Sequence, residues 1–118
     1  MDVGGPKTEV LFRLMEATTL RAKVIAGNVS NQNTPGYTRK TVRFEDDLRQ
    51  AMLNGESTRG LAPTVEEDNL SPARADGNNV TLELELNSMR ENRMMYETYS
   101  TILGAHFELL RTAIKDGN

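Results

Sequence analysis

The chain has no cysteine and only one histidine, and each of these shortages removes a class of function; it also has no tryptophan. Without cysteine there can be neither disulfides nor thiolate metal sites. With His106 as the one histidine, neither a Ser/His/Asp triad nor a typical zinc site is available within one chain. We therefore expect no enzyme, no cofactor, no catalytic residue and no metal ligand.

Aromatic residues are also scarce, and long apolar runs are missing. Three Phe and three Tyr in 118 residues, with a mean hydropathy of −0.54, predict a thin core for a chain that folds alone. No window approaches the roughly 20 apolar residues of a membrane span, and no direct lipid binding is expected, because a net charge of −3 gives no electrostatic attraction to an anionic membrane. A net charge of −3 gives no electrostatic reason to bind nucleic acid. Residues 1–7 lack the apolar stretch of a cleavable secretion signal.

A ten-residue run, 28–37, predicts the end of a long helix. It contains three asparagines and then a helix-breaking sequence: Asn28, Asn31, Asn33, Thr34, Pro35, Gly36 and Tyr37. Proline has no amide proton and pushes the preceding residue toward extended geometry, while glycine permits positive φ. Before the run, apolar or small residues recur every three or four positions and predict an amphipathic helix over residues 8–33. They are Leu11, Met15, Thr18, Ala22, Ile25 and Val29.

The middle of the chain predicts a short, irregular insert. Residues 37–44 alternate in character and indicate an extended segment. Phe44, Leu48 and Met52 then recur every four residues and predict a short helix that stops at Asn54 and Gly55. Glycine- and proline-rich residues 54–79 predict a loop with a brief strand at 64–66, in which the acidic run 66–68 is interpreted as a solvated charge run.

The C-terminal third predicts one long helix over residues 82–115. Leucines at 82, 84 and 86 alternate with polar residues, which locally favours a strand, but nothing after them breaks the backbone. Thr81 is a suitable N-cap for this helix. An apolar stripe with heptad spacing follows: Met89, Tyr96, Leu103, Phe107, Leu110 and Ile114.

Two long helices at opposite ends of the chain predict a mainly α fold. We expect them to pack as an antiparallel, coiled-coil-like hairpin, with the β-containing insert and its short helix between them. Three units follow along the chain: residues 1–37, 38–80 and 81–118. Each helix stripe is wider than a two-stranded seam requires. The remaining apolar surface is therefore expected to pack on other copies or related subunits.

The run 28–37 resembles the N-terminal signature of bacterial flagellar axial proteins, Asn-x-Ala-Asn-x-x-Thr-Pro-Gly-Tyr. Six of its residues fall in register, and Ser30 stands where the family usually has alanine. Within this family the chain looks like a proximal rod protein, because the segment 44–48, the turn 76–80 and the apolar run 107–114 also match. The resemblance covers about residues 8–53 and 74–115, whereas residues 54–73 match nothing in the family.

The resemblance implies a structural subunit of the periplasmic flagellar rod. Such a subunit would leave the cell through the flagellar type III export system, without a cleaved signal. Its partners would be copies of itself, other rod proteins, the junction protein between the MS ring and the rod, and components of the export gate. It would transmit torque and line the export channel. Two alternatives stay open, namely another rod protein of the family and a helical adaptor or export-chaperone-like binding module.

Phe44 and Leu48 allow two interpretations. Rod and hook subunits carry a Phe-x-x-x-hydrophobic element that the export gate recognises, and this segment looks similar. One helical turn separates the two side chains, so they could enter an apolar pocket together. The other interpretation is that they anchor the short helix on the hairpin. Both roles are compatible if the chain is unfolded during export and packed afterwards.

Overall fold

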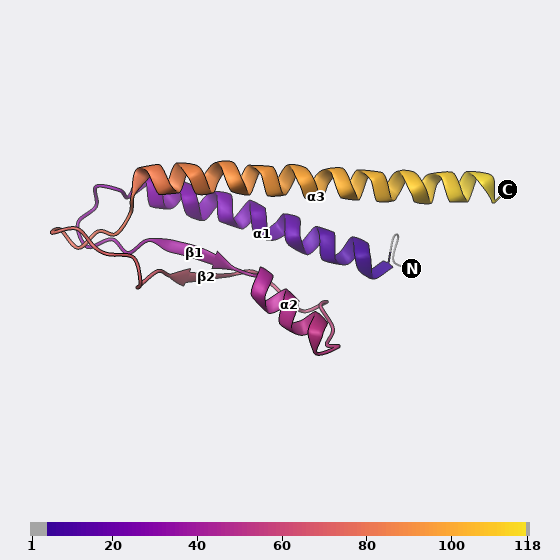
Figure 1. The fold of residues 1–118 in the computed structure, drawn as a ribbon, viewed down its shortest axis with the longest axis horizontal. Coiled ribbons are helices and arrows are strands. Elements are labelled where there is room, and N and C mark those ends of the chain that lie inside the picture. The colour runs from indigo at the N-terminus through magenta and orange to yellow at the C-terminus, as the bar shows by residue number, and fades with distance from the viewer. Residues whose placement is uncertain (1–4, 118) are drawn as a thin grey trace.

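The computed structural model describes residues 5–117. It contains α1 (Gly5–Ser30), β1 (Lys40–Arg43), α2 (Glu45–Leu53), β2 (Thr64–Glu67) and α3 (Leu82–Asp116). The predicted mainly α architecture is confirmed: α1 and α3 run antiparallel side by side, with the insert on the other side of α1 (Figure 1). The molecule is elongated, with extents of 67 × 28 × 18 Å.

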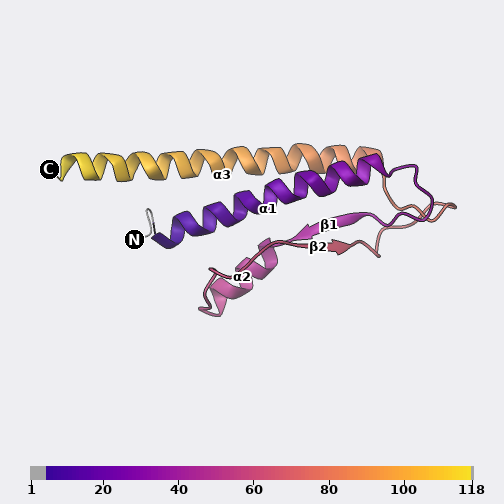
Figure 2. The same cartoon turned by 180° about the vertical axis from the view of Figure 1, so that it is seen from behind.

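The two long helices differ in length. At 35 residues, α3 is about 52 Å long. With 26 residues, α1 is about 39 Å long. The end of α3 therefore continues past the beginning of α1, as Figure 2 shows from the opposite side. Among the described residues, no helix combines the length and the apolar character needed to cross a bilayer.

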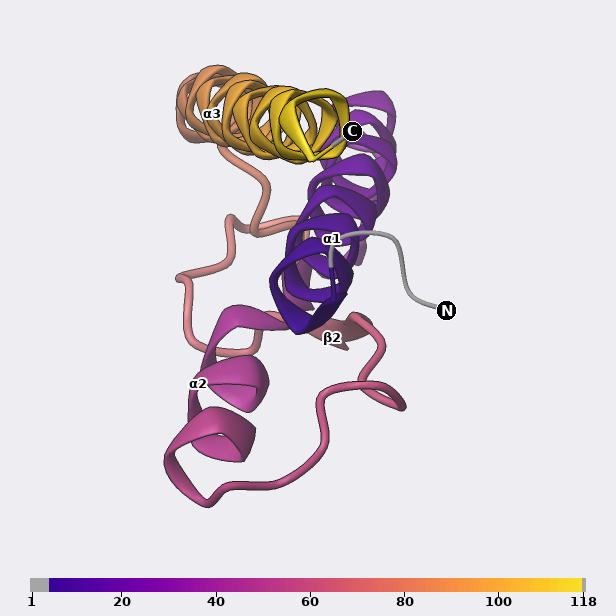
Figure 3. The same ribbon diagram turned by 90° about the vertical axis from the view of Figure 1, so that its right-hand side faces the viewer.

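Helix α1 forms the middle layer of the molecule, between α3 above and the insert below (Figure 3). A small core joins it to the insert, where Ala17 packs with Phe44 and Leu48. Three partly buried side chains pack against this core: Val10, Leu14 and Leu61. Helix α1 thus needs two packing faces. The predicted stripe covers only one of them, because a single 3.6-residue period describes one face of a helix.

The observed ends of the elements differ from the predicted ones by a few residues. Helix α1 ends at Ser30, where the hydrogen bonds change to turns: the Asn31 amide bonds the carbonyls of Gly27 at 3.1 Å and Asn28 at 3.2 Å, and the Gln32 amide bonds only the Val29 carbonyl, three residues back, at 3.2 Å. The predicted extended segment 37–44 narrows to β1, which pairs antiparallel with β2 and places Val42 opposite Val65. Thr81 is the N-cap of α3, but its side chain makes no capping hydrogen bond. Residues 1–4 and 118, which belong to the predicted units 1–37 and 81–118, lie outside the described residues.

Candidate functional site: a buried polar cluster and an exposed helix face

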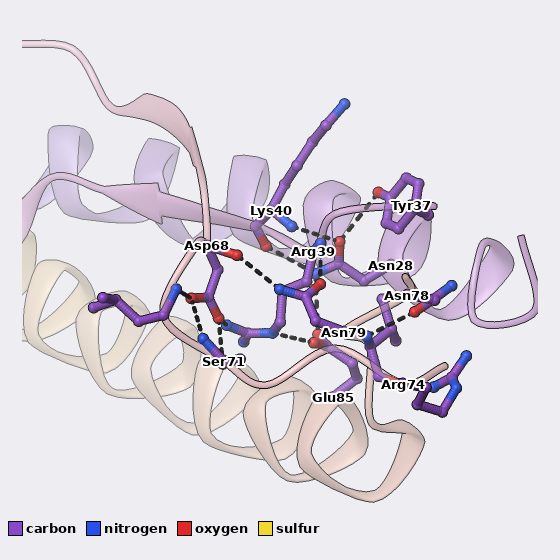
Figure 4. A network of polar contacts seen from close by, with 12 residues as sticks. Asn28, Tyr37, Arg39, Lys40, Asp68, Ser71, Arg74, Asn78, Asn79 and Glu85 are labelled. Atoms are coloured by element: carbon purple, nitrogen blue, oxygen red, sulfur yellow. Dashed lines mark hydrogen bonds and ion pairs between the residues drawn. The ribbon is translucent and has the colours of Figure 1, made fainter. Parts of the chain in front are cut away.

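Asn28, the first residue of the predicted signature, lies fully buried at the centre of a polar cluster (Figure 4). Its side-chain amide donates to the Lys40 carbonyl at 2.8 Å, and its oxygen accepts from the Lys40 amide at 2.9 Å. The same oxygen accepts from the Tyr37 hydroxyl at 3.2 Å, and the amide also reaches Glu85 at 3.2 Å. One carboxamide therefore joins α1 to β1, to the signature loop and to the beginning of α3.

Arg39 lies between two carboxylates in this cluster. Its Nε donates to Glu85 at 2.5 Å and its terminal nitrogen to Asp68 at 2.8 Å. Burial alone would lower the pKa of Arg39, but hydrogen bonds and charge from Glu85 and Asp68 raise it above its usual value. Hydrogen bonds from the Ser71 hydroxyl and from Arg39 hold the pKa of Asp68 well below its usual range. Both partners are therefore fully charged at neutral pH.

Asn78 and Asn79 attach the turn before α3 to the rest of the cluster. The Asn78 amide donates to the carbonyls of Asn31 at 2.8 Å and Thr34 at 2.9 Å, both in the signature loop. The Asn79 oxygen accepts from the backbone amide of Arg39 at 2.6 Å, and its nitrogen donates to the Asp68 carbonyl at 2.7 Å. These contacts satisfy backbone groups that neither helices nor strands can satisfy.

Gly77 and Gly36 bring the two loops into backbone contact. Both have positive φ, at +85° and +74°, and a Cβ on Gly77 would lie 3.3 Å from the Gly36 Cα. The Gly36 amide donates to the carbonyl of Asp76 at 2.8 Å. Positive φ and the close approach together explain why glycine is required at residue 77.

The Gly77→Ala variant is expected to lose about 1–2 kcal/mol of unfolding free energy, because alanine is strained at positive φ and its Cβ presses on Gly36. The matched control is Gly60→Ala, since Gly60 lies in a turn with open space around it and no positive φ. Urea denaturation of both variants measures the difference. Equal midpoints for the two variants would contradict the proposed role of the glycine contact.

The other signature residues serve the loop itself. Asn31 donates to the Gly27 carbonyl at 2.8 Å and caps the end of α1, while its oxygen accepts from the Thr34 hydroxyl at 3.1 Å. Asn33 and Pro35 lie exposed on the outside of the turn. The signature loop is therefore held from inside by its own Asn28 and by Asn78 of the turn before α3, while its tip is exposed.

Phe44 and Leu48 point into the small core, at 1% and 6% exposure. Phe44 is also the N-cap residue of α2 and makes no side-chain capping hydrogen bond there. In the folded chain these two side chains anchor the short helix on α1. Another molecule could reach them only after this part of the chain unfolds.

The predicted assembly stripes differ in how much α1 and α3 cover them. On α1, Leu11 and Ile25 are buried, and Met15 and Val29 are half-buried. On α3, Leu103 is buried and Leu110 half-buried. The remaining residues of the α3 stripe are exposed: Met89 at 38%, Tyr96 at 44%, Phe107 at 36% and Ile114 at 70%.

Sequence reasoning missed most of the polar cluster. The acidic run 66–68 is not uniformly solvated as predicted, because Asp68 is half-buried and ion-paired. Glu85 is fully buried although the predicted stripe did not include it, while Leu84 is exposed at 60%. The usable signal was helical phase: Glu85, Asn92 and Leu103 share one face of α3, seven and eleven residues apart.

The polar cluster is a folding contact in which each charge meets an opposite charge or a hydrogen-bond partner. Within residues 5–117, no group of three or more His, Asp or Glu side chains is arranged to hold a metal ion. The fold and the cluster define an elongated helical hairpin whose polar groups organise its loops. Most of the α3 stripe remains exposed.

Comparison with known proteins supports a component of the flagellar basal body rod. No protein-family model matches the chain. The flagellar basal body rod protein FlgB of Borrelia hermsii is 29% identical over 135 residues, covering 98% of this chain and 100% of the relative. FlgB of Salmonella typhimurium (strain LT2) is 29% identical over 125 residues, covering 87% and 91%. FlgB of Escherichia coli (strain K12) is 26% identical over 125 residues, with the same coverage. Over most of its length the chain is similar to FlgB, a flagellar basal body rod protein, and these relatives confirm the resemblance found in the sequence.

Proposed function

We propose that this rod component is a structural subunit of the proximal rod that polymerises through α1 and α3. Its neighbours would be copies of itself, other rod proteins and a FliE-like protein at the junction with the MS ring. In the assembled rod it would transmit torque and line the channel through which later subunits pass. The subunit would act in the periplasm, after export by the flagellar type III system without a cleaved signal.

The exposed stripe of α3 carries this proposal. Tyr96, Phe107 and Ile114 lie on one side of a helix whose partner, α1, does not cover them. Burying one such side chain is worth about 1.5–3 kcal/mol. Monomeric proteins rarely leave apolar side chains in a continuous row along a helix, whereas subunits of an assembly do so at their interfaces.

The signature loop would act as a spacer between neighbouring subunits. Its inner residues are held by Asn28 and Asn78, while Asn33 and Pro35 face outward. A loop fixed from inside presents its exposed tip with little loss of conformational entropy on contact. The three units 1–37, 38–80 and 81–118 would then have separate roles, with the two outer ones in assembly and the middle one bracing α1.

The Phe107→Glu, Ile114→Glu double variant tests the stripe. Because both side chains are exposed, the hairpin should fold, but two carboxylates would prevent burial of this face against a neighbour. The expected result is loss of concentration-dependent self-association in sedimentation velocity, and loss of hook-bearing basal bodies in cells carrying the variant. Thr101→Glu, Thr112→Glu is the matched control, because it adds two carboxylates at exposed polar positions of α3.

Two results would contradict the proposal. If the stripe variant assembles as well as the control, the stripe is not an assembly surface. If the unaltered chain stays a compact, cooperatively melting monomer or dimer at high concentration and binds a single partner, the adaptor interpretation is correct instead. A poorly ordered monomer that gains helix on mixing with other rod proteins supports the rod subunit.

A further inference from the structure

Two grooves follow the seam between α1 and α3, one on each side, and Asn92 lines both. The Asn92 amide donates to the Thr18 carbonyl at 2.8 Å and fixes the floor that the grooves share. We call the first the cationic groove; it is lined by Thr18, Thr19, Ala22, Lys23, Met89, Asn92, Arg93 and Tyr96. We call the second the acidic groove; it is lined by Arg21, Glu45, Ser88, Glu91, Asn92 and Met95.

The grooves differ in charge. Lys23 and Arg93 line the cationic groove without any carboxylate among its residues. Arg93 reaches Glu97 at 3.3 Å, but both side chains are mostly exposed and the pair is solvent-screened. In the acidic groove, Arg21 is paired with Glu45 at 2.8 Å, which leaves the exposed Glu91 to set the sign of the charge.

Apolar side chains accompany the charges on both sides. Met89 and Tyr96 form the apolar wall of the cationic groove. Met95 lines the acidic groove. A neighbouring hollow shares Ser88 and Glu91 with the acidic groove and adds the exposed Leu84. Each side of the seam therefore offers apolar contact area next to charges of one sign.

We propose that the cationic groove of one copy receives the acidic side of α3 of a second copy, with Lys23 and Arg93 facing Glu91 across the contact. The proposal rests on the rod function and specifies one of its interfaces. Because the two surfaces are different and lie on opposite sides of the seam, the contact is heterologous. Each copy keeps one unused surface of each kind, so the contact propagates into an open helical array instead of closing as a dimer. Opposite charges set the register, and their contribution falls as salt rises.

Charge reversal tests the pairing directly. The first variant, Lys23→Glu with Arg93→Glu, makes both grooves acidic, and the second, Glu91→Lys, makes both cationic. Either variant alone is expected to self-associate at least about tenfold more weakly in low-salt sedimentation velocity, because like charges then meet at every contact. An equimolar mixture is expected to regain association, since each variant's groove now faces the opposite charge on the other.

The control reverses two exposed cations outside both grooves, Lys7→Glu with Arg49→Glu, and makes the same change in net charge as the first variant. It should associate like the unaltered chain. If the first variant associates normally, or if the mixture stays dissociated, the groove pairing is wrong. The rod function is tested separately by the Phe107→Glu, Ile114→Glu variant. An unaltered chain that is monomeric at every concentration also overturns the pairing of identical copies. The basal-body counts then decide the rod function separately.

Discussion

Replacing Arg39 with methionine is expected to lower the free energy of unfolding by about 3–5 kcal/mol, the usual cost of breaking a buried ion pair from one side. The reason is Glu85, which is fully buried and depends on Arg39 for its counter-charge. Asn28 would remain as a neutral hydrogen-bond donor to it, which is too little to stabilise a buried carboxylate. Urea denaturation at pH 7, with the slope checked for constancy, measures the change.

Two companion variants isolate the charge from the packing. Arg43→Met removes an arginine whose side chain is 47% exposed and whose ion pairs lie at the surface, so a loss of no more than about 1 kcal/mol is expected. The Arg39→Met, Glu85→Met double variant removes both charges and should be more stable than Arg39→Met alone, because no uncompensated charge remains. If the double variant is no more stable than Arg39→Met alone, the buried charge of Glu85 is not the cause.

The helices of this protein could be predicted from sequence because their determinants are local. Periodic apolar residues and the Thr34-Pro35-Gly36 breaker indicated α1, and the four-residue recurrence from Phe44 indicated α2. The brief predicted strand at 64–66 also lies within β2, although its partner β1 could not be identified. Element ends shifted by up to three residues, since the hydrogen bonds of the last turn decide them.

The polar cluster could not be predicted because its contacts are distant in sequence. Arg39 meets Asp68 across 29 positions and Glu85 across 46. Before folding brings α3 against the insert, each of these residues looks like an ordinary surface charge. Glu85 is the clearest example. In the local sequence it is one of the polar residues that alternate with leucines, but it lies on the face of α3 that packs on α1, together with Asn92 and Leu103.

The packing of α3 also explains why so much of its apolar surface remains uncovered. The buried positions of α3 are Glu85, Asn92 and Leu103, so the half nearest the loops is held to α1 mainly by polar contacts. Hydrogen bonds fix direction and register more strictly than apolar packing does. The seam inside one copy is thus specified by polar groups, and the heptad stripe is left for contacts between copies under the proposed function.

Export is the second property for which a large effect is expected. Under the proposed function, the export gate would recognise Phe44 and Leu48 in an unfolded chain, because both side chains are buried once the core forms. Leu48→Ala should then reduce secretion about tenfold or more, since a leucine side chain contributes about 1.5–3 kcal/mol when it enters an apolar pocket. The ratio of chain outside the cells to chain inside, measured by immunoblot, gives the effect.

Leu11→Ala is the matched control for this experiment. Leu11 and Leu48 are both 6% exposed, and each substitution should destabilise the folded chain by about 2–5 kcal/mol. If secretion depended only on how easily the chain unfolds, the two variants would be secreted alike, and neither less than the unaltered chain. If secretion falls for Leu48→Ala but not for Leu11→Ala, the export machinery must recognise the Leu48 side chain itself. Equal secretion of the two variants would leave Leu48 as a core residue alone, because the packing of α2 on α1 would then account for its whole role.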